Sequence, residues 1–142
     1  MGYKGAKETM KKFFMCLAVV LFAGMTFTSC GKKSEADLLL GKWSVASVTT
    51  TIDGVTVEKT IEGSEYMYYT FASDGKYLQD VNAEGNKWTY NGTYELNGKT
   101  LILDKGTVDE GVYSIQTLNA SQLTMQGFMG SDVVVYQMNK VK

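Results

Sequence analysis

The chain has 142 residues, the length of one domain, with 14 lysines, 15 acidic residues, no arginine, histidine or proline, and a formal net charge of −1. The lack of histidine excludes a Ser-His-Asp triad, a Cys-His pair and an imidazole metal site. The lack of arginine excludes a bidentate phosphate or carboxylate clamp.

The N-terminus has the pattern of a secretory signal peptide. Residues 13–29 carry no charge, and Lys11 and Lys12 come directly before them. A basic start, an apolar core and small residues at the end make up such a signal. An uncleaved membrane-anchoring helix is the alternative, although this apolar run is short for a membrane span. Translation could begin at Met1 or at Met10, because Met10-Lys11-Lys12 is itself an ordinary signal start.

The signal ends in Phe27-Thr28-Ser29-Cys30-Gly31, which resembles the lipobox of bacterial lipoproteins, as found in those of the Bacteroides type. The resemblance implies that Cys30 is joined by a thioether to diacylglycerol and becomes the acylated N-terminus after cleavage. Acyl chains then hold the protein on a membrane, since each buried methylene contributes about 0.8 kcal/mol. We expect a signal peptide over 1–29, a lipidated cysteine and short tether over 30–38, and one domain over 39–142.

Cleavage before Cys30 changes both the charge and the cysteine content of the chain. The remaining 113 residues have ten lysines and fourteen acids, a net charge of −4. Cys16 is removed and Cys30 is lipidated, so no thiol remains for disulfide, redox or metal-thiolate chemistry. The acidic balance argues against nucleic acid as a partner and against a polybasic membrane patch. We expect no cofactor and no metal, and a membrane attachment that depends on lipid alone.

From Leu39 onward the chain reads as strands and turns, after at most one helical turn over residues 37–40. In residues 87–96, aromatic or apolar side chains alternate with polar ones, the pattern of a half-buried strand. The alternation continues through Asn91-Gly92, which favours a bend or bulge at Gly92 over a hairpin turn. Further strands are expected over 42–52, 55–58, 66–72, 77–81, around 101–103, and over 111–118, 122–128 and 133–140.

These short links predict an all-β fold, an antiparallel up-and-down barrel of eight or nine strands. Parallel pairing would need long crossover connections, which the chain lacks. No proline interrupts any predicted strand, which fits a sheet without blunted edges and therefore a closed one.

Leu39-Leu40-Gly41-Lys42-Trp43 resembles the Gly-x-Trp start of the first strand in lipocalins. Residues 69–77 and Gly92-Thr93-Tyr94 resemble the small lipocalin-like domains of Bacteroides-type lipoproteins, so the resemblance covers residues 39–142. It implies an eight-stranded barrel with Gly41 and Trp43 as its structural signature and Trp43 plugging one end. Lipocalins place an arginine over this tryptophan, and here Lys140 or Lys142 would substitute for it.

The alternation also predicts an aromatic and methionine-rich barrel interior. These side chains could line a pocket for a small hydrophobic ligand, with tyrosine hydroxyls orienting it, or could simply fill the core of a small barrel. The candidate ligand-binding residues are Met67, Tyr69, Phe71, Trp88, Tyr90, Tyr94, Tyr113, Met125 and Tyr136.

Outside the barrel, Tyr66 and Tyr68 would face solvent in this register and could mark a contact surface.

Acids in turn-like stretches show no spacing that indicates a glycosidase pair, namely Asp80, Glu84, Asp109 and Glu110. We therefore expect no catalytic residue and no enzyme.

The functional prediction is a lipid-anchored protein of the bacterial cell envelope that binds or carries a small hydrophobic ligand. We expect it on the outer membrane facing the periplasm, with surface display as the other orientation. The alternative function is a structural or protein-interaction module of the envelope, with a solid core and no ligand.

Overall fold

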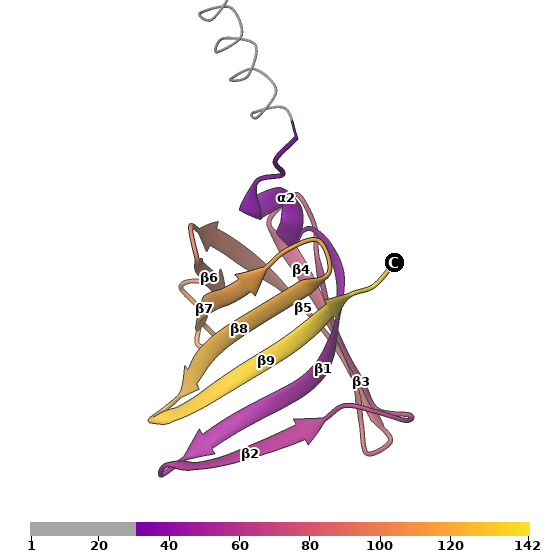
Figure 1. Ribbon diagram of the computed structural model, residues 1–142, viewed down its shortest axis with the longest axis vertical. Coiled ribbons are helices and arrows are strands. Elements are labelled where there is room, and N and C mark those ends of the chain that lie inside the picture. Colours follow the sequence, from indigo (N-terminus) through magenta and orange to yellow (C-terminus); the bar gives the residue numbers. More distant parts are fainter. Residues whose placement is uncertain (1–30) are drawn as a thin grey trace, which may run out of the picture. The chain divides into compact units, whose positions relative to one another are not determined.

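The computed structural model describes residues 31–142, and the predicted signal segment and Cys30 lie outside this range. Within it, one short helix precedes nine strands, close to the predicted ranges (Figure 1). None of the helices in this part has the length and apolar character to cross a membrane. The elements are α2 (Glu35–Leu39), β1 (Gly41–Ile52), β2 (Val55–Thr60), β3 (Tyr66–Phe71), β4 (Lys76–Ala83), β5 (Asn86–Asn97), β6 (Thr100–Leu103), β7 (Gly111–Leu118), β8 (Gln122–Met129) and β9 (Asp132–Lys140).

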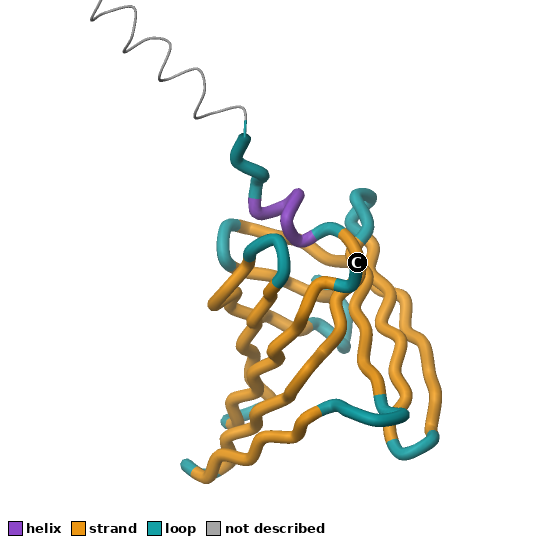
Figure 2. The backbone as a smooth tube through the Cα atoms, turned by 45° about the vertical axis from the view of Figure 1, so that its right-hand side comes forward, coloured by secondary structure: helices purple, strands orange, loops and turns teal. Residues whose placement is uncertain are grey.

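Eight of these strands close into an antiparallel barrel because β1 pairs with both β3 and β9 (Figures 1 and 2). From β3 to β9 each strand pairs with its neighbour in sequence, so the predicted all-β barrel is confirmed. The ninth strand, β2, pairs with the second half of β1 and with no other described strand. The expectation of a closed sheet is therefore confirmed for these eight strands, whereas the outer side of β2 has no partner among the described strands.

Two β-bulges decide which side chains of the long strands face the barrel interior. In β1 the register with β9 shifts between Val45 and Ser47. The extra residue reverses the alternation, so Trp43 and Val45 face inward before the shift and Val48 after it. The register of β7 with β8 shifts in the same way beyond Ile115.

β5 continues through Gly92, as expected, and has no bulge there, because it pairs with β4 through this residue without a register shift. Gly92 instead allows a close approach inside the barrel. A Cβ atom there would overlap Oδ1 of Asp104 and lie 2.5 Å from Cε1 of Tyr77. A glycine at this position therefore leaves the room that the carboxylate and the phenol ring occupy.

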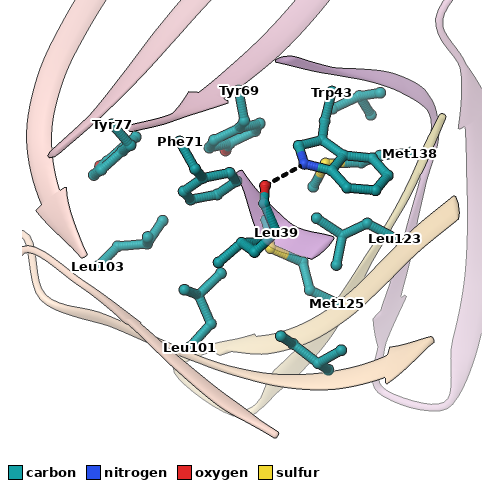
Figure 3. Packing of buried hydrophobic residues seen from close by; sticks show 12 residues of the cluster. Leu39, Trp43, Tyr69, Phe71, Tyr77, Leu101, Leu103, Leu123, Met125 and Met138 are labelled. Atoms are coloured by element: carbon teal, nitrogen blue, oxygen red, sulfur yellow. Dashed lines mark hydrogen bonds between the residues drawn. The ribbon is translucent and has the colours of Figure 1, made fainter. Parts of the chain in front are cut away.

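Helix α2 lies at one end of the barrel and contributes to its core. It begins in a capping box, in which Ser34 Oγ accepts from the Asp37 N–H (3.1 Å) and the Asp37 carboxylate accepts from the Ser34 N–H (3.3 Å). Leu39 is fully buried, and its carbonyl oxygen accepts a hydrogen bond from Trp43 Nε1 at 2.8 Å (Figure 3). The helix thus begins within the segment expected as a tether, two residues before the predicted turn, and ends one residue before that turn ends.

The half of the barrel next to α2 is a solid core (Figure 3). Phe71 packs edge-on against Tyr94, with ring centroids 5.1 Å apart. The most deeply buried side chains are Leu39, Trp43, Val45, Phe71, Val81, Leu101, Leu123 and Met125.

Lys140, near the end of β9, takes the place expected for the arginine of lipocalins. Its Nζ lies 4.3 Å from the ring centroid of Trp43 and donates to the carbonyl oxygens of Leu38 (3.1 Å) and Leu40. Gly41 adopts a φ of +107°, and a Cβ atom there would lie 3.1 Å from Cε of Lys140. The lysine therefore joins the last strand to the junction between α2 and β1.

We predict that Lys140→Met lowers the free energy of unfolding by about 1–3 kcal/mol. The methionine keeps an apolar stem over Trp43 but loses the charge and the hydrogen bonds to carbonyl oxygens. Urea denaturation followed by tryptophan fluorescence measures the change. Lys142→Met, at an exposed lysine, is the matched control and should change stability by less than about 0.5 kcal/mol. Equal effects of the two substitutions would mean that the Lys140 contacts contribute no stability.

Candidate functional site

Two cavities lie in the part of the barrel beyond the solid core. The first, which we name the apolar recess, has a volume of about 480 Å³ and is lined mainly by aliphatic side chains of β1 to β4. The second, which we name the tyrosine chamber, has a volume of about 340 Å³ and is lined by tyrosines and two aspartates.

The apolar recess exists because β2 leaves the barrel wall. β3 pairs only with the first residues of β1, Gly41–Ser44, whereas β2 pairs with the stretch from Ser47 to Ile52. Beyond Ser44 the wall between β2 and β3 has no ladder of hydrogen bonds. Side chains from both sides of this gap line the recess, chiefly Val48, Ile52, Val57, Ile61, Met67 and Val81.

The recess also holds a few polar groups. Lys59 and Glu65 form an ion pair (Nζ to Oε2, 3.2 Å). Asn82 is only 7% exposed and donates through Nδ2 to the carbonyl oxygen of Ser64 at 2.6 Å. Its Oδ1 has no hydrogen-bond partner among the described residues. Buried polar atoms are nearly always paired. The unpaired Oδ1 of Asn82 is therefore an exception, an acceptor without a donor beside an apolar surface.

The tyrosine chamber is bordered by a continuous arc of five phenol rings. Neighbouring ring centroids lie 6.1 Å apart for Tyr90 and Tyr77, 6.2 Å for Tyr77 and Tyr69, 6.4 Å for Tyr69 and Tyr136, and 6.2 Å for Tyr136 and Tyr113. These separations are those of interacting aromatic pairs, so each ring supports the next. The arc surrounds the chamber with aromatic surface.

A buried carboxylate completes the chamber. Asp104 directly follows β6, has a φ of +53° and is 5% exposed. Its Oδ2 accepts from the Tyr77 hydroxyl at 2.6 Å, and its Oδ1 accepts from the Thr93 N–H at 3.0 Å. Asp109, in the loop before β7, lines the same chamber. The chamber is thus both aromatic and acidic.

The chamber tyrosines stay protonated well into the alkaline range. Burial raises the pKa of Tyr69 well above its ordinary value of 10.0, and raises those of Tyr113 and Tyr136 as well. Burial is also the largest cause of the raised pKa of Tyr77. The hydrogen bond from Tyr77 to Asp104 raises this pKa further. At neutral pH the phenols are therefore uncharged, and their hydroxyls can donate hydrogen bonds.

Five of the nine predicted ligand-binding residues line a cavity. Tyr69, Tyr90, Tyr113 and Tyr136 line the tyrosine chamber, and Met67 lines the apolar recess. Alternation identified these positions because it reports which face of a strand points inward.

The other four lie elsewhere. Phe71 and Met125 belong to the solid core, and Tyr94 packs against it. Trp88 shares its strand face with Tyr90 but is 48% exposed and lines neither cavity. Alternation shows which face of a strand points inward, but not how far along the barrel axis a residue lies. The position along this axis separates these four residues from the five that line a cavity.

Sequence reasoning missed the polar side chains of both cavities. Asp104 follows the apolar run of residues 101–103 and precedes Lys105-Gly106, so it reads as an ordinary turn acid. Only its left-handed backbone turns it into the barrel.

Of the acids weighed for catalysis, Asp109 lines the chamber, whereas Asp80 pairs with the outward-facing Tyr68. Among the described residues no three acidic, cysteine or histidine side chains gather as a metal site.

Tyr66 and Tyr68 lie on the strand face opposite Tyr69, as predicted, with their rings stacked 5.1 Å apart. Lys42 Nζ lies 4.0 Å from the ring centroid of Tyr68. Both tyrosines are half-buried, and Tyr66 also borders the apolar recess.

We predict that the protein loses stability as the pH rises above about 10. Tyrosines of the unfolded chain ionise near that pH, whereas Tyr69 and Tyr77 in the folded protein keep their protons. The unfolded state then binds fewer protons, so the free energy of unfolding falls, while below that pH these groups add no pH dependence. Urea midpoints from about pH 8 to about pH 11 measure the effect.

Phenolate absorbance provides the control for this prediction. Ionisation of the buried tyrosines should coincide with the loss of circular dichroism, and Tyr69→Phe should make the decline in stability less steep. Complete ionisation in a protein that is still folded would contradict the prediction.

Comparison with known proteins agrees with this architecture. A family model described as a lipocalin-like domain matches residues 39–125. The structure is similar to that of the odorant-binding protein from bovine nasal mucosa, with a TM-score of 0.51 and 13% identity over 79% of this chain and 76% of that one. The complex of bovine odorant-binding protein with undecanal gives the same values. No curated protein sequence matches the chain.

Proposed function

Since the chain belongs to the lipocalin-like domain family, we propose that it binds a small hydrophobic molecule in the apolar recess, as a binding or carrier protein and not as an enzyme. The observation that carries the proposal is the recess itself, about 480 Å³ lined mainly by aliphatic side chains. Sites for small molecules are concave, mostly apolar and of this size, with a few polar groups that orient the ligand.

The lining suggests how such a ligand is held. Its apolar part contacts Val48, Ile61, Met67 and Val81, and Asn82, whose Oδ1 has no partner among the described residues, borders the same recess. Burial of about 200 Å² of ligand surface contributes about 5 kcal/mol. Association and ordering cost an amount of similar size, so a preformed wall matters for affinity. The pairing of β2 with β1 supplies part of that wall.

We also propose that a lipid on Cys30 holds the protein on a membrane of the bacterial cell envelope, on the outer membrane facing the periplasm. The lipobox-like sequence supports this proposal. Only Gly31, Lys32 and Lys33 separate Cys30 from Ser34, the N-cap of α2. The net charge of −4 after cleavage gives no electrostatic reason for membrane attachment.

We predict that the protein without its lipid binds N-phenyl-1-naphthylamine with an increase in the fluorescence of this apolar probe. Undecanal, the molecule named with bovine odorant-binding protein, should displace it. Ala83→Phe, which adds a ring to the lining of the recess, should weaken binding by about tenfold or more, equal to about 1.4 kcal/mol.

Ala120→Phe is the matched control, because it adds the same ring at an exposed residue between β7 and β8 and should leave binding unchanged. Absence of probe binding, or equal binding by both variants, would remove the apolar recess as the site. The envelope module without a ligand would then be the better description.

We predict that Cys30→Ser releases the protein from membranes and abolishes its labelling by fatty acid, because only a thiol forms the thioether to diacylglycerol. Fractionation of cells into soluble and membrane parts measures the release. Ser29→Ala keeps a small residue before Cys30 and should leave the protein on the membrane. Retention of the Cys30→Ser protein would mean that the apolar N-terminal run is an uncleaved anchor.

A further inference from the structure

We propose that the tyrosine chamber is a second binding site, one that takes a small organic cation with an ammonium group. This goes beyond the hydrophobic ligand proposed for the apolar recess, because it concerns a different cavity with different chemistry. The residues that carry the inference are Asp104, Asp109 and the arc of phenol rings.

The first observation is an excess of negative charge in the chamber. Asp104 is 5% exposed, and its carboxylate receives hydrogen bonds from a phenol and a backbone N–H, neither of which carries charge. Asp109 adds a second carboxylate, and no lysine is among the residues lining the chamber. Lys105, the nearest lysine in sequence, pairs with Glu95 at 2.7 Å, and both of these side chains are about half exposed. A buried carboxylate without an opposite charge is costly, and a cationic ligand would supply that charge.

The second observation is the aromatic surface around this charge. The faces of phenol rings are negative and attract cations, most strongly where water is excluded. Five rings form the arc from Tyr90 to Tyr113, and each lies within 6.4 Å of the next. Cages of aromatic rings combined with an acid are how proteins recognise alkylated ammonium groups.

The third observation is that the chamber is held in shape by its neighbours. A Cβ atom at Gly127 would lie 2.7 Å from Cδ1 of Tyr113, and one at Gly111 would lie 2.8 Å from Cε2 of the same ring. The Tyr113 ring therefore occupies space that any other residue at these two positions would fill. Gln79 donates to the Tyr69 hydroxyl at 2.9 Å, which orients a second ring. These contacts reduce the ordering that ligand binding would require.

Other ligand classes fit this chamber less well. An anion would face two carboxylates, and a neutral apolar molecule would leave Asp104 buried without an opposite charge. A metal ion would need more ligands, and no such cluster exists among the described residues. The volume of about 340 Å³ is at the small end of ligand sites, which favours a compact cation.

The test uses choline and its neutral isostere 3,3-dimethylbutan-1-ol, which replaces the ammonium nitrogen by carbon. Both are titrated into the purified Cys30→Ser protein by calorimetry. We expect choline to bind and the alcohol to bind at least about tenfold more weakly, since the two differ only in charge. Equal binding of the two molecules, or no binding of choline, would overturn the proposal.

Three variants locate the binding. Asp104→Asn and Asp109→Asn each remove one carboxylate, and Tyr90→Leu removes a ring that is 37% exposed and so can be lost with little disturbance of the core. Each should weaken choline binding by about fivefold or more. Asp80→Asn makes the same charge change on the outward face of β4 and should have no effect. Near-ultraviolet circular dichroism shows which variants keep the native packing.

If Asp104→Asn fails to fold, Asp109→Asn and Tyr90→Leu decide the question, because neither residue belongs to the buried core. Loss of choline binding in Asp80→Asn to the same extent as in these variants would reduce the effect to surface charge and overturn the proposal. Ala83→Phe should weaken binding of the apolar probe by about tenfold or more and leave choline binding unchanged. Each proposal can therefore fail without the other.

Discussion

The structure depends on the fact that β1 pairs with three strands. Its residues from Trp43 to Thr51 pair with β9 and close the barrel, while its opposite edge is divided between β3 at the start and β2 at the end. A strand has only two edges, so β2 and β3 cannot both occupy the same stretch of β1. The pairing of β1 with β3 closes the barrel at one end. Because β2 takes the rest of this edge, β3 has no partner there, which leaves the gap behind the apolar recess.

A second consequence is the division of the interior along the barrel axis. At the α2 end, Trp43 is held by the Leu39 carbonyl and by Lys140, and apolar side chains fill the space around it. Farther along, tyrosines replace aliphatic residues, and Asp104 turns inward beside Gly92. Phenol rings are stiff and carry hydroxyl groups, so they border a polar cavity where leucine or methionine would pack closely.

The two cavities have opposite chemistry although they share one barrel. The apolar recess offers aliphatic surface and one free amide oxygen, whereas the tyrosine chamber offers carboxylates and ring faces. Neighbouring residues of β3 and β4 separate them, since Met67 and Val81 line the recess and Tyr69 and Gln79 line the chamber. A change of two positions along a strand therefore moves a side chain from one cavity to the other.

The sequence by itself determined the secondary structure, the antiparallel order and the inward face of most strands. These follow from local turns and from a two-residue alternation that each strand carries in its own residues. The Gly-x-Trp start of the first strand, and a lysine as the partner of Trp43, could also be predicted from the sequence. The place of β2 outside the wall, the bulges in β1 and β7, and the burial of Asp104 were decided only by the tertiary structure. They depend on competition between strands for one edge, on register between distant segments and on depth along the barrel axis, none of which leaves a local pattern.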